Sequence, residues 1–292
     1  MSVLYHYTSL QGLIGILTTG SVWCSHCEYL NDSSEFNHAI DFAKDVSNQI
    51  FMEDDYLAAI GYTLRDSLEK MAKPNVFVTS FSEKADLLSQ WRGYCSQGSG
   101  ISLGFDKELL NQYCAEHGLR LEKCLYDTNL HTSLINKFTN ESIKMFPPLG
   151  ISREEYDGLS SSEQCNFEIS SRMDMDKEEN RLSFKQAINK LFEQLNTYAP
   201  LMKHYGFHEE TEWRIIANNP KEDVISYRPS NSHIIPYLIL PILKRYPKIL
   251  QEIYIGPSPE PYRCKASIQY LLTDRNLRDV KIKISKLPFT SW

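Results

Sequence analysis

Strand-like segments lie toward both ends of the chain, and a polar, helix-like stretch separates them. In the segments "NVFVTSFS", "GISLGF", "IIPYLIL" and "VKIKIS", apolar residues alternate or follow one another, as is typical of β-strands. From residue 129 to about residue 198 the composition becomes polar and helical in pattern. This arrangement predicts a single α+β domain over residues 1–292, with a mixed, mostly antiparallel sheet and a mainly helical insertion at about 129–198.

The first residues carry clear element boundaries. Residues 3–7 predict a strand, and Ser9 is a residue type that caps a helix N-terminus. Apolar residues at positions 10, 13, 14 and 17 then recur at helical spacing until Gly20, a common helix-ending residue. Further helices are predicted over about 35–50 and 56–71, and near the segments "DLLSQWRGY" and "KELLNQYCAEHG".

Two predicted strands carry polar residues on one face. In "NVFVTSFS", Ser80 and Ser82 should share a face of a half-buried strand, because side chains alternate along a strand. A strand over residues 210–217 would place Glu210, Glu212 and Arg214 together on its polar face. Such a group of charges occurs in catalytic sites and in structural ion-pair networks alike.

Composition excludes several classes of protein. The net charge of −6 argues against sequence-independent binding to nucleic acid, which needs clustered cations. A local basic patch is still open, and its candidates are Lys244, Arg245, Lys248, Lys281, Lys283 and Lys286. The opening residues lack the regions of a signal peptide and no long apolar run follows, so we expect a cytoplasmic protein without a membrane segment.

The seven cysteines are scattered and odd in number, which is typical of free thiols in a reducing compartment. Cys24 and Cys27 form a lone C-x-x-C pair, and no second pair at zinc-ligand spacing follows. We therefore expect no metal centre.

Four sequence blocks contain the candidate site residues: "YHYTS", "TSFS", "SQWRGY" and "EETEWR". Each alone has an ordinary structural explanation. His6 is more often a half-buried packing residue, Trp91 and Tyr94 are more often packing residues than a ligand platform, and the glutamates could form a surface ion-pair ladder. The occurrence of all four blocks in one chain favours a functional site.

The blocks also carry a resemblance. "LYHYTS", "LND", "SFS" followed by "LLSQWRGY", "GISLGF", "GFHEETEWR" and "IYIGPSP" occur in this order in a widespread bacterial family of unknown function, which the chain resembles over nearly its whole length. That family in turn distantly resembles the ADP-ribosyltransferase fold, with a histidine on the first strand, a serine-rich middle strand and E-x-E on a late strand. The chain mixes features of two groups within that fold.

The resemblance implies that NAD is a substrate. Glu212 then matches the second glutamate of E-x-E, Glu210 the first, and His6 the histidine that orients the ribose. Ser80, with Ser82 beside it, matches the serine motif. Further candidates for NAD binding are the rings of Trp91 or Tyr94, which could stack on nicotinamide, and the guanidinium of Arg92, which could hold the pyrophosphate.

Three functions stay open. The first is an NAD-consuming enzyme, either a mono-ADP-ribosyltransferase or an NAD glycohydrolase, in toxin action or antiphage defence, with an unknown protein or nucleic acid as acceptor. The second is a non-catalytic nucleotide-binding, sensor or interaction module. The third is a hydrolase or nuclease without NAD, for which the chain offers no acidic block beyond "DMDKEE".

The enzyme hypothesis makes a geometric demand. The strands over 3–7 and 210–217 should lie in the same or facing sheets, and the side chains of His6 and Glu212 should open to one cleft. Trp91, Arg92 and Tyr94 should line or border that cleft.

Overall fold

A computed structural model describes residues 2–30, 34–71, 74–94, 100–175 and 177–288, with only the backbone given for residues 34–37 and Tyr94. Two compact units are formed. The first comprises Met1–Asn31, Asn75–Tyr126 and Tyr205–Trp292, and the second comprises Asp32–Pro74 and Asp127–His204. The second unit thus contains the predicted insertion and also the helices before residue 74, which the sequence patterns do not group with it. The single-domain interpretation stays a prediction.

The first unit contains one large sheet. Its strands are β1 (Val3–Ser9), β2 (Val22–His26), β3 (Val76–Ser82), β4 (Gly100–Asp106), β5 (Arg120–Lys123), β6 (Glu212–Asn218), β7 (Ile225–Pro229), β8 (Ile234–Leu240), β9 (Leu250–Ile255) and β10 (Lys281–Ile284). Along the sheet the order is β10-β9-β4-β1-β3-β2-β8-β7, and β6 pairs with both β3 and β5. All pairings are antiparallel except that of β9 with β10. The predicted α+β class and mixed, mostly antiparallel sheet are confirmed.

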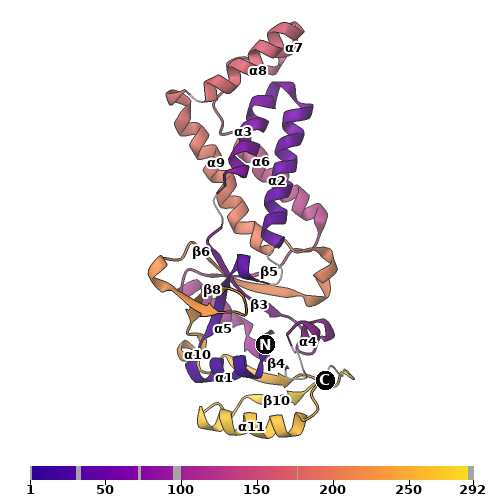
Figure 1. Cartoon of the computed structure of the whole chain (residues 1–292), viewed down its shortest axis with the longest axis vertical. Helices are drawn as coiled ribbons and strands as arrows, with labels where there is room; N and C mark the ends of the chain where they lie inside the picture. The colour runs from indigo at the N-terminus through magenta and orange to yellow at the C-terminus, as the bar shows by residue number, and fades with distance from the viewer. Residues whose placement is uncertain (1, 31–33, 72–73, 95–99, 176, 289–292) are drawn as a thin grey trace. The chain divides into compact units, whose positions relative to one another are not determined.

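Helices accompany the sheet in the first unit and make up the second. Those of the first unit are α1 (Leu10–Thr19), α4 (Leu88–Tyr94), α5 (Lys107–Glu116), α10 (Ile242–Arg245) and α11 (Pro261–Asp274). Those of the second are α2 (Ser34–Glu53), α3 (Ala58–Glu69), α6 (Thr128–Ile143), α7 (Arg153–Asp157), α8 (Ser161–Met175) and α9 (Glu178–Tyr198). The predicted helical character of residues 129–198 is confirmed. Figure 1 shows α11 beside β10 in the first unit.

Local signals fix the first helix as the sequence predicts. The Ser9 Oγ accepts a hydrogen bond from the backbone N–H of Gly12, at 3.1 Å, which satisfies one of the free donors at the start of α1. Gly20 ends the helix with a φ of 65°, a conformation that favours glycine because it has no Cβ. The strand–helix unit at the chain start therefore has well-defined ends.

β3 is the central strand of the first unit, and its environment differs from the prediction. Six of its residues are buried and only Ser80 is partly exposed. β6 pairs along one edge, while β1 and β2 share the other. The half-buried strand is therefore a wrong prediction. Its alternating pattern comes from serines that lie in a buried polar region on one face.

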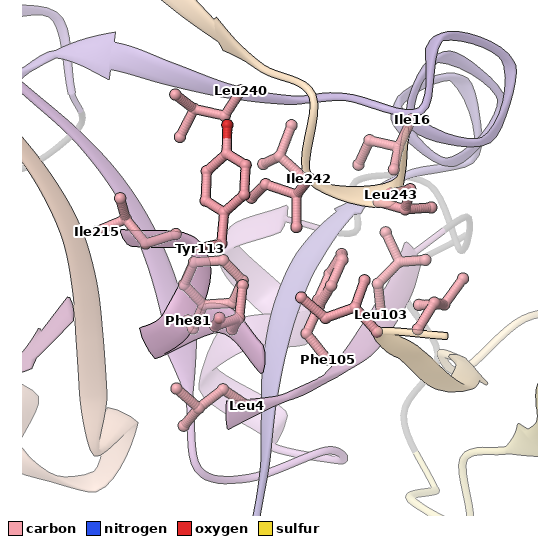
Figure 2. Close-up of a cluster of buried hydrophobic side chains, with 14 of the residues drawn as sticks. Leu4, Ile16, Phe81, Leu103, Phe105, Tyr113, Ile215, Leu240, Ile242 and Leu243 are labelled. Carbon is pink, nitrogen blue, oxygen red and sulfur yellow. The ribbon is translucent and has the colours of Figure 1, made fainter. Parts of the chain in front are cut away.

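The main apolar core lies on the face of the sheet that carries Leu4 and Phe81. These side chains are 0% and 2% exposed, and they belong to a cluster that extends through β4, α5 and α10. Figure 2 shows Leu4, Phe81, Phe105 and Tyr113 within this cluster. The rings of Phe81 and Phe105 meet edge to face, with centroids 5.7 Å apart.

In the second unit, α2 and α3 pack closely around a glycine. A Cβ placed on Gly61 of α3 would lie 2.6 Å from the backbone nitrogen of Phe51 in α2. The α6 helix contacts both α2 and α9, and Figure 1 shows these helices within the second unit. No helix in the described part of the chain is both long and apolar enough to cross a membrane.

Candidate functional site

Three of the four predicted blocks meet on neighbouring strands. His6 lies on β1, the serines lie on β3 and Glu212 lies on β6. Because β3 pairs with both β1 and β6, the expectation that the first and late strands share a sheet is confirmed. The region around β3 is therefore the candidate site.

Register brings the serine block and the acidic block onto one face. Ser82 pairs with Glu212 and Ser80 with Arg214, although about 130 residues separate the two strands in sequence. Directly paired residues of an antiparallel ladder point to the same face with their Cβ atoms close together. The four polar side chains thus form a compact group, and we call it the β3–β6 polar group.

Glu212 and Arg214 form an ion pair within this group, which we call closed because both carboxylate oxygens contact the guanidinium. Arg214 Nε donates to Glu212 Oε1 at 2.7 Å, and a second guanidinium nitrogen donates to Oε2 at 3.2 Å. The side chains are 5% exposed for Arg214 and 6% for Glu212. Two-point contact between a guanidinium and a carboxylate is the strongest form of such a pair. The predicted neighbours are therefore in contact, and little solvent reaches either.

Glu210 does not share the strand with them. It ends a 3₁₀ turn, Tyr205–Glu210, and the next residue, Thr211, has a φ of 42°. This backbone conformation breaks the alternation, so the predicted common strand face for Glu210, Glu212 and Arg214 is wrong for Glu210. The Glu210 carbonyl instead accepts a hydrogen bond from Ser82 Oγ at 2.6 Å.

Thr211 carries two unusual features beside Glu212. A positive φ is a genuine outlier for a β-branched residue. Its Oγ1 is also buried without a hydrogen-bond partner among the described residues. The backbone on both sides of it is held: the Thr211 N–H donates to the His208 carbonyl at 3.2 Å, and the Glu212 N–H donates to Tyr126 Oη at 2.8 Å.

His6 reaches β3 through its ring. Nδ1 lies 3.0 Å from the carbonyl oxygen of Ser80, and because a carbonyl only accepts, Nδ1 carries the proton. The ring also meets Phe81, with centroids 5.6 Å apart. Burial lowers the pKa of His6, and the hydrogen bond to Ser80 opposes this shift only in part. The ring thus links β1 to β3. In the described residues, the backbones of these two strands pair only at Tyr5 and Ser82.

The same register separates His6 from Glu212. Tyr5 pairs with Ser82 and Ser82 with Glu212, so these three side chains share one face of the sheet. His6 follows Tyr5 and therefore points to the other face, where it meets Phe81 of the main core. The prediction that His6 and Glu212 open to one cleft is wrong.

Trp91 is a packing residue in this structure. Its side chain is 0% exposed, and its ring meets that of Tyr7 at a centroid distance of 4.7 Å. A Cβ on Gly256 would lie 2.9 Å from the Trp91 ring, and the indole N–H donates to Asp86 at 2.7 Å. The blocks "YHYTS", "SQWRGY" and "IYIGPSP" therefore meet in one packed cluster. A fully enclosed ring offers no face to a nicotinamide here.

The other two residues of that block are less informative. Arg92 follows Trp91 in α4 and its side chain is exposed. Tyr94 ends the same helix, and its side chain lies outside the described residues. Their predicted contacts with pyrophosphate and nicotinamide stay predictions.

One polar cluster near the site joins Tyr5 of the "YHYTS" block to two residues outside the four blocks. Tyr5 Oη donates to Glu252 Oε1 at 2.6 Å, and Lys283 forms an ion pair with Glu252 Oε2, also at 2.6 Å. Burial alone would raise the pKa of Glu252, but the bonds from Lys283 and Tyr5 outweigh it and lower the pKa. Glu252 shares the sheet face of Glu212, since Tyr5 pairs with Gly104 and Gly104 with Glu252. Only the tertiary pairing of β1, β4 and β9 reveals the cluster.

The C-x-x-C cysteines are buried. Cys24 is 0% exposed, and burial raises the pKa of its thiol well above the usual range. Burial likewise raises the pKa of Cys27 to about 11. Within the described ranges, no group of three or more histidine, cysteine or acidic side chains is placed to hold a metal ion.

Comparison with known proteins identifies a family match over part of the chain. Residues 90–215 match a family described as protein of unknown function, DUF2971. The matched range includes segments of both compact units. It covers less than half of the 292 residues, and it contains Trp91 and Glu212 but neither His6 nor the two serines. Neither a search of curated proteins nor a search of solved structures gave a match.

The predicted resemblance to a family of unknown function is thus supported in part, by the match over residues 90–215. The more distant resemblance to the ADP-ribosyltransferase fold stays a prediction.

Proposed function

We propose that the chain is an NAD-consuming enzyme of the ADP-ribosyltransferase type, with Glu212 as its catalytic carboxylate. The observation that supports this most is the pairing of Ser82 with Glu212 and of Ser80 with Arg214. A serine-rich strand and a late acidic strand are the two motifs that the resemblance associates with NAD, and here they are neighbours with their polar side chains on one face.

The backbone at Thr211 supports the same position. Residues held in sparsely populated conformations cluster at functional sites, where the surrounding structure maintains the strain. Thr211 immediately precedes Glu212, and hydrogen bonds fix the chain on both sides of it. The strain thus lies beside the proposed catalytic group.

The chemistry uses few protein groups. The bond between nicotinamide and the ribose C1′ breaks, and nicotinamide leaves with the bonding electron pair. The positive charge that develops on the ribose is stabilised by a nearby carboxylate, which is the role assigned to Glu212. An acceptor nucleophile, or water, then forms a bond to C1′ and loses a proton.

This proposal changes two roles from the sequence hypothesis. His6 is removed from the catalytic set because it points to the opposite face of the sheet. Its ring bonds the Ser80 carbonyl, so we assign it the positioning of β3. Trp91 is removed from the binding set because it is fully buried.

A second candidate function is a non-catalytic nucleotide-binding or interaction module. The closed ion pair of Glu212 and Arg214 favours it, because a carboxylate with 6% exposure must leave its partner before it contacts a ribose. In this alternative the β3–β6 polar group is structural.

NAD turnover decides between the two. Purified protein is incubated with NAD labelled in its ADP-ribose part, with and without cell lysate, and both nicotinamide release and labelled acceptors are measured. The variant replaces both charges, Glu212→Gln with Arg214→Gln, so that neither charge stays buried after the other is removed. We expect a loss of a hundredfold or more, on the order expected for a preorganised electrostatic group.

Glu252→Gln is the matched control. Glu252 is another buried carboxylate with a cationic partner on the same sheet face, but it lies outside the four blocks. It should leave turnover unchanged. Absence of NAD turnover in the parent protein with every lysate tested, or full turnover in the double variant, would favour the module.

A further inference from the structure

A cavity of about 520 Å³ lies in the first unit, and none of its lining residues is a predicted site residue. One wall comes from α1 through Leu10, Leu13 and Ile14, and the other comes from α11 through Ile268 and Leu271. Gly100 and Ile255, at the ends of β4 and β9, also contribute to the lining. Cavities of this size with mostly apolar walls are typical of small-molecule sites.

The cavity mouth exposes apolar surface without an evident structural reason. Leu10 is 37% exposed and Ile14 is 54% exposed, although both belong to the apolar side of α1. Cys264 of α11 also lines the cavity, and burial raises the pKa of its thiol, so that it stays uncharged at neutral pH. The walls therefore suit the apolar body of a ligand.

The charged residues at the mouth indicate which end group the ligand carries. Glu260 is the N-cap residue of α11, a position where the helix dipole favours a negative charge. Arg263 lies in the first turn of the same helix, where that dipole disfavours a cation. In the described part of the chain Arg263 has no carboxylate within ion-pair distance, so the fold itself gives no reason for its charge. An anion bound at the mouth would pair with the positive charge of Arg263.

We propose that this cavity binds a small amphipathic anion, with an apolar body between α1 and α11 and its negative group on Arg263. The site is independent of the proposed NAD chemistry, because it lies on other elements. The ligand is one free molecule enclosed by the cavity, and a membrane surface is the alternative that the test must separate.

Binding is measured with octanoate, decanoate and dodecanoate, by calorimetry on the full chain. We expect affinity to rise about fourfold with each added methylene while the chain still enters the cavity. Alkylammonium ions of equal length should bind much more weakly. Arg263→Gln should weaken carboxylate binding about tenfold, the loss expected for a charged hydrogen bond.

Two positions on α11 provide a matched pair of variants. Ser267 and Gln269 are both exposed, but only Ser267 lines the cavity. Ser267→Phe should abolish binding by filling the space, while Gln269→Phe should leave it unchanged. Thiol alkylation locates the ligand: dodecanoate should slow modification of Cys264, followed by peptide mass spectrometry, and leave the exposed Cys165 unaffected.

Two results would overturn the proposal. The first is equal binding of carboxylates and alkylammonium ions, or equal effects of the two phenylalanine variants. The second is sedimentation with vesicles of phosphatidylglycerol by a protein that binds no free carboxylate, which would assign the exposed leucine and isoleucine to a membrane surface. The Glu212→Gln/Arg214→Gln variant should bind dodecanoate normally, whatever happens to NAD turnover.

Discussion

Removal of one partner of the Glu212–Arg214 pair should destabilise the first unit strongly. Glu212→Gln keeps the shape of the side chain but leaves the guanidinium of Arg214, which is 5% exposed, beside a neutral amide. Breaking a buried pair in this way costs about 3–5 kcal/mol, because the remaining charge stays desolvated. Arg214→Gln should cost a similar amount. The double variant should cost less than the sum by about 2–3 kcal/mol, since it removes both charges together.

A neighbouring, more exposed ion pair provides a comparison. Arg120 and Glu122 lie two residues apart on β5, with the guanidinium 2.8 Å from the carboxylate oxygen. Their side chains are 28% and 40% exposed, and Glu122 pairs with Arg214 in the sheet. Glu122→Gln should therefore cost no more than about 1 kcal/mol, as is usual for pairs that water reaches.

Tryptophan fluorescence during urea unfolding reports the first unit selectively. None of the four tryptophans occurs in the two segments of the second unit, and Trp213 lies between Glu212 and Arg214 in β6. Equal losses of unfolding free energy for Glu212→Gln and Glu122→Gln would refute the reasoning.

Three further outcomes are expected. Gly61→Ala should destabilise the second unit by about 1–3 kcal/mol, because the added Cβ meets the backbone of α2; the loss is measured by far-ultraviolet circular dichroism during unfolding. In α1 of the first unit, a Cβ on Gly15 meets nothing within 4 Å, so Gly15→Ala should stabilise by about 0.5–1 kcal/mol. The lowered pKa of His6 means that the unfolded chain binds its proton first, so this part of the stability is full above pH 6.5 and is lost as the pH falls. His6→Gln should flatten that pH dependence, by up to about 1.4 kcal/mol per pH unit. Thr211→Asn should raise the unfolding free energy by about 1 kcal/mol, because asparagine tolerates a positive φ, and should lower NAD turnover if the strain serves catalysis.

Local patterns predicted the elements of the sheet well. The cap at Ser9, the glycine at position 20 and the alternation in β3 each rest on interactions within a few residues. Such signals are present in the sequence itself, so the strand–helix order of the first unit and the helical character of residues 129–198 could be predicted. The contribution of α2 and α3 to the second unit could not, because it depends on contacts between distant segments.

The site was harder to predict, because two of its features cannot be derived from a few neighbouring residues. The sequence pattern predicts a regular strand through Glu210, but the positive φ of Thr211 interrupts it, so that the strand begins at Glu212. The enzyme hypothesis also requires one cleft for His6 and Glu212, but presence in one sheet does not place two side chains on one face. The face of each side chain depends instead on the register of β1 against β3, and a single pairing, Tyr5 with Ser82, decides it.

The closed ion pair finally links the stability of the fold to the choice between enzyme and module. A ligand shifts an equilibrium only by its different affinity for the two states, so any ligand that needs Glu212 released must offset the cost of opening the pair. If opening costs about 3 kcal/mol, the competent state is populated less than one part in a hundred, and the apparent affinity falls by the same factor. An enzyme built this way would bind NAD weakly unless the ribose hydroxyls replaced the bonds that Arg214 makes. A module that leaves the pair closed avoids this cost. NAD turnover by the parent protein and by the double variant therefore distinguishes the enzyme from the module.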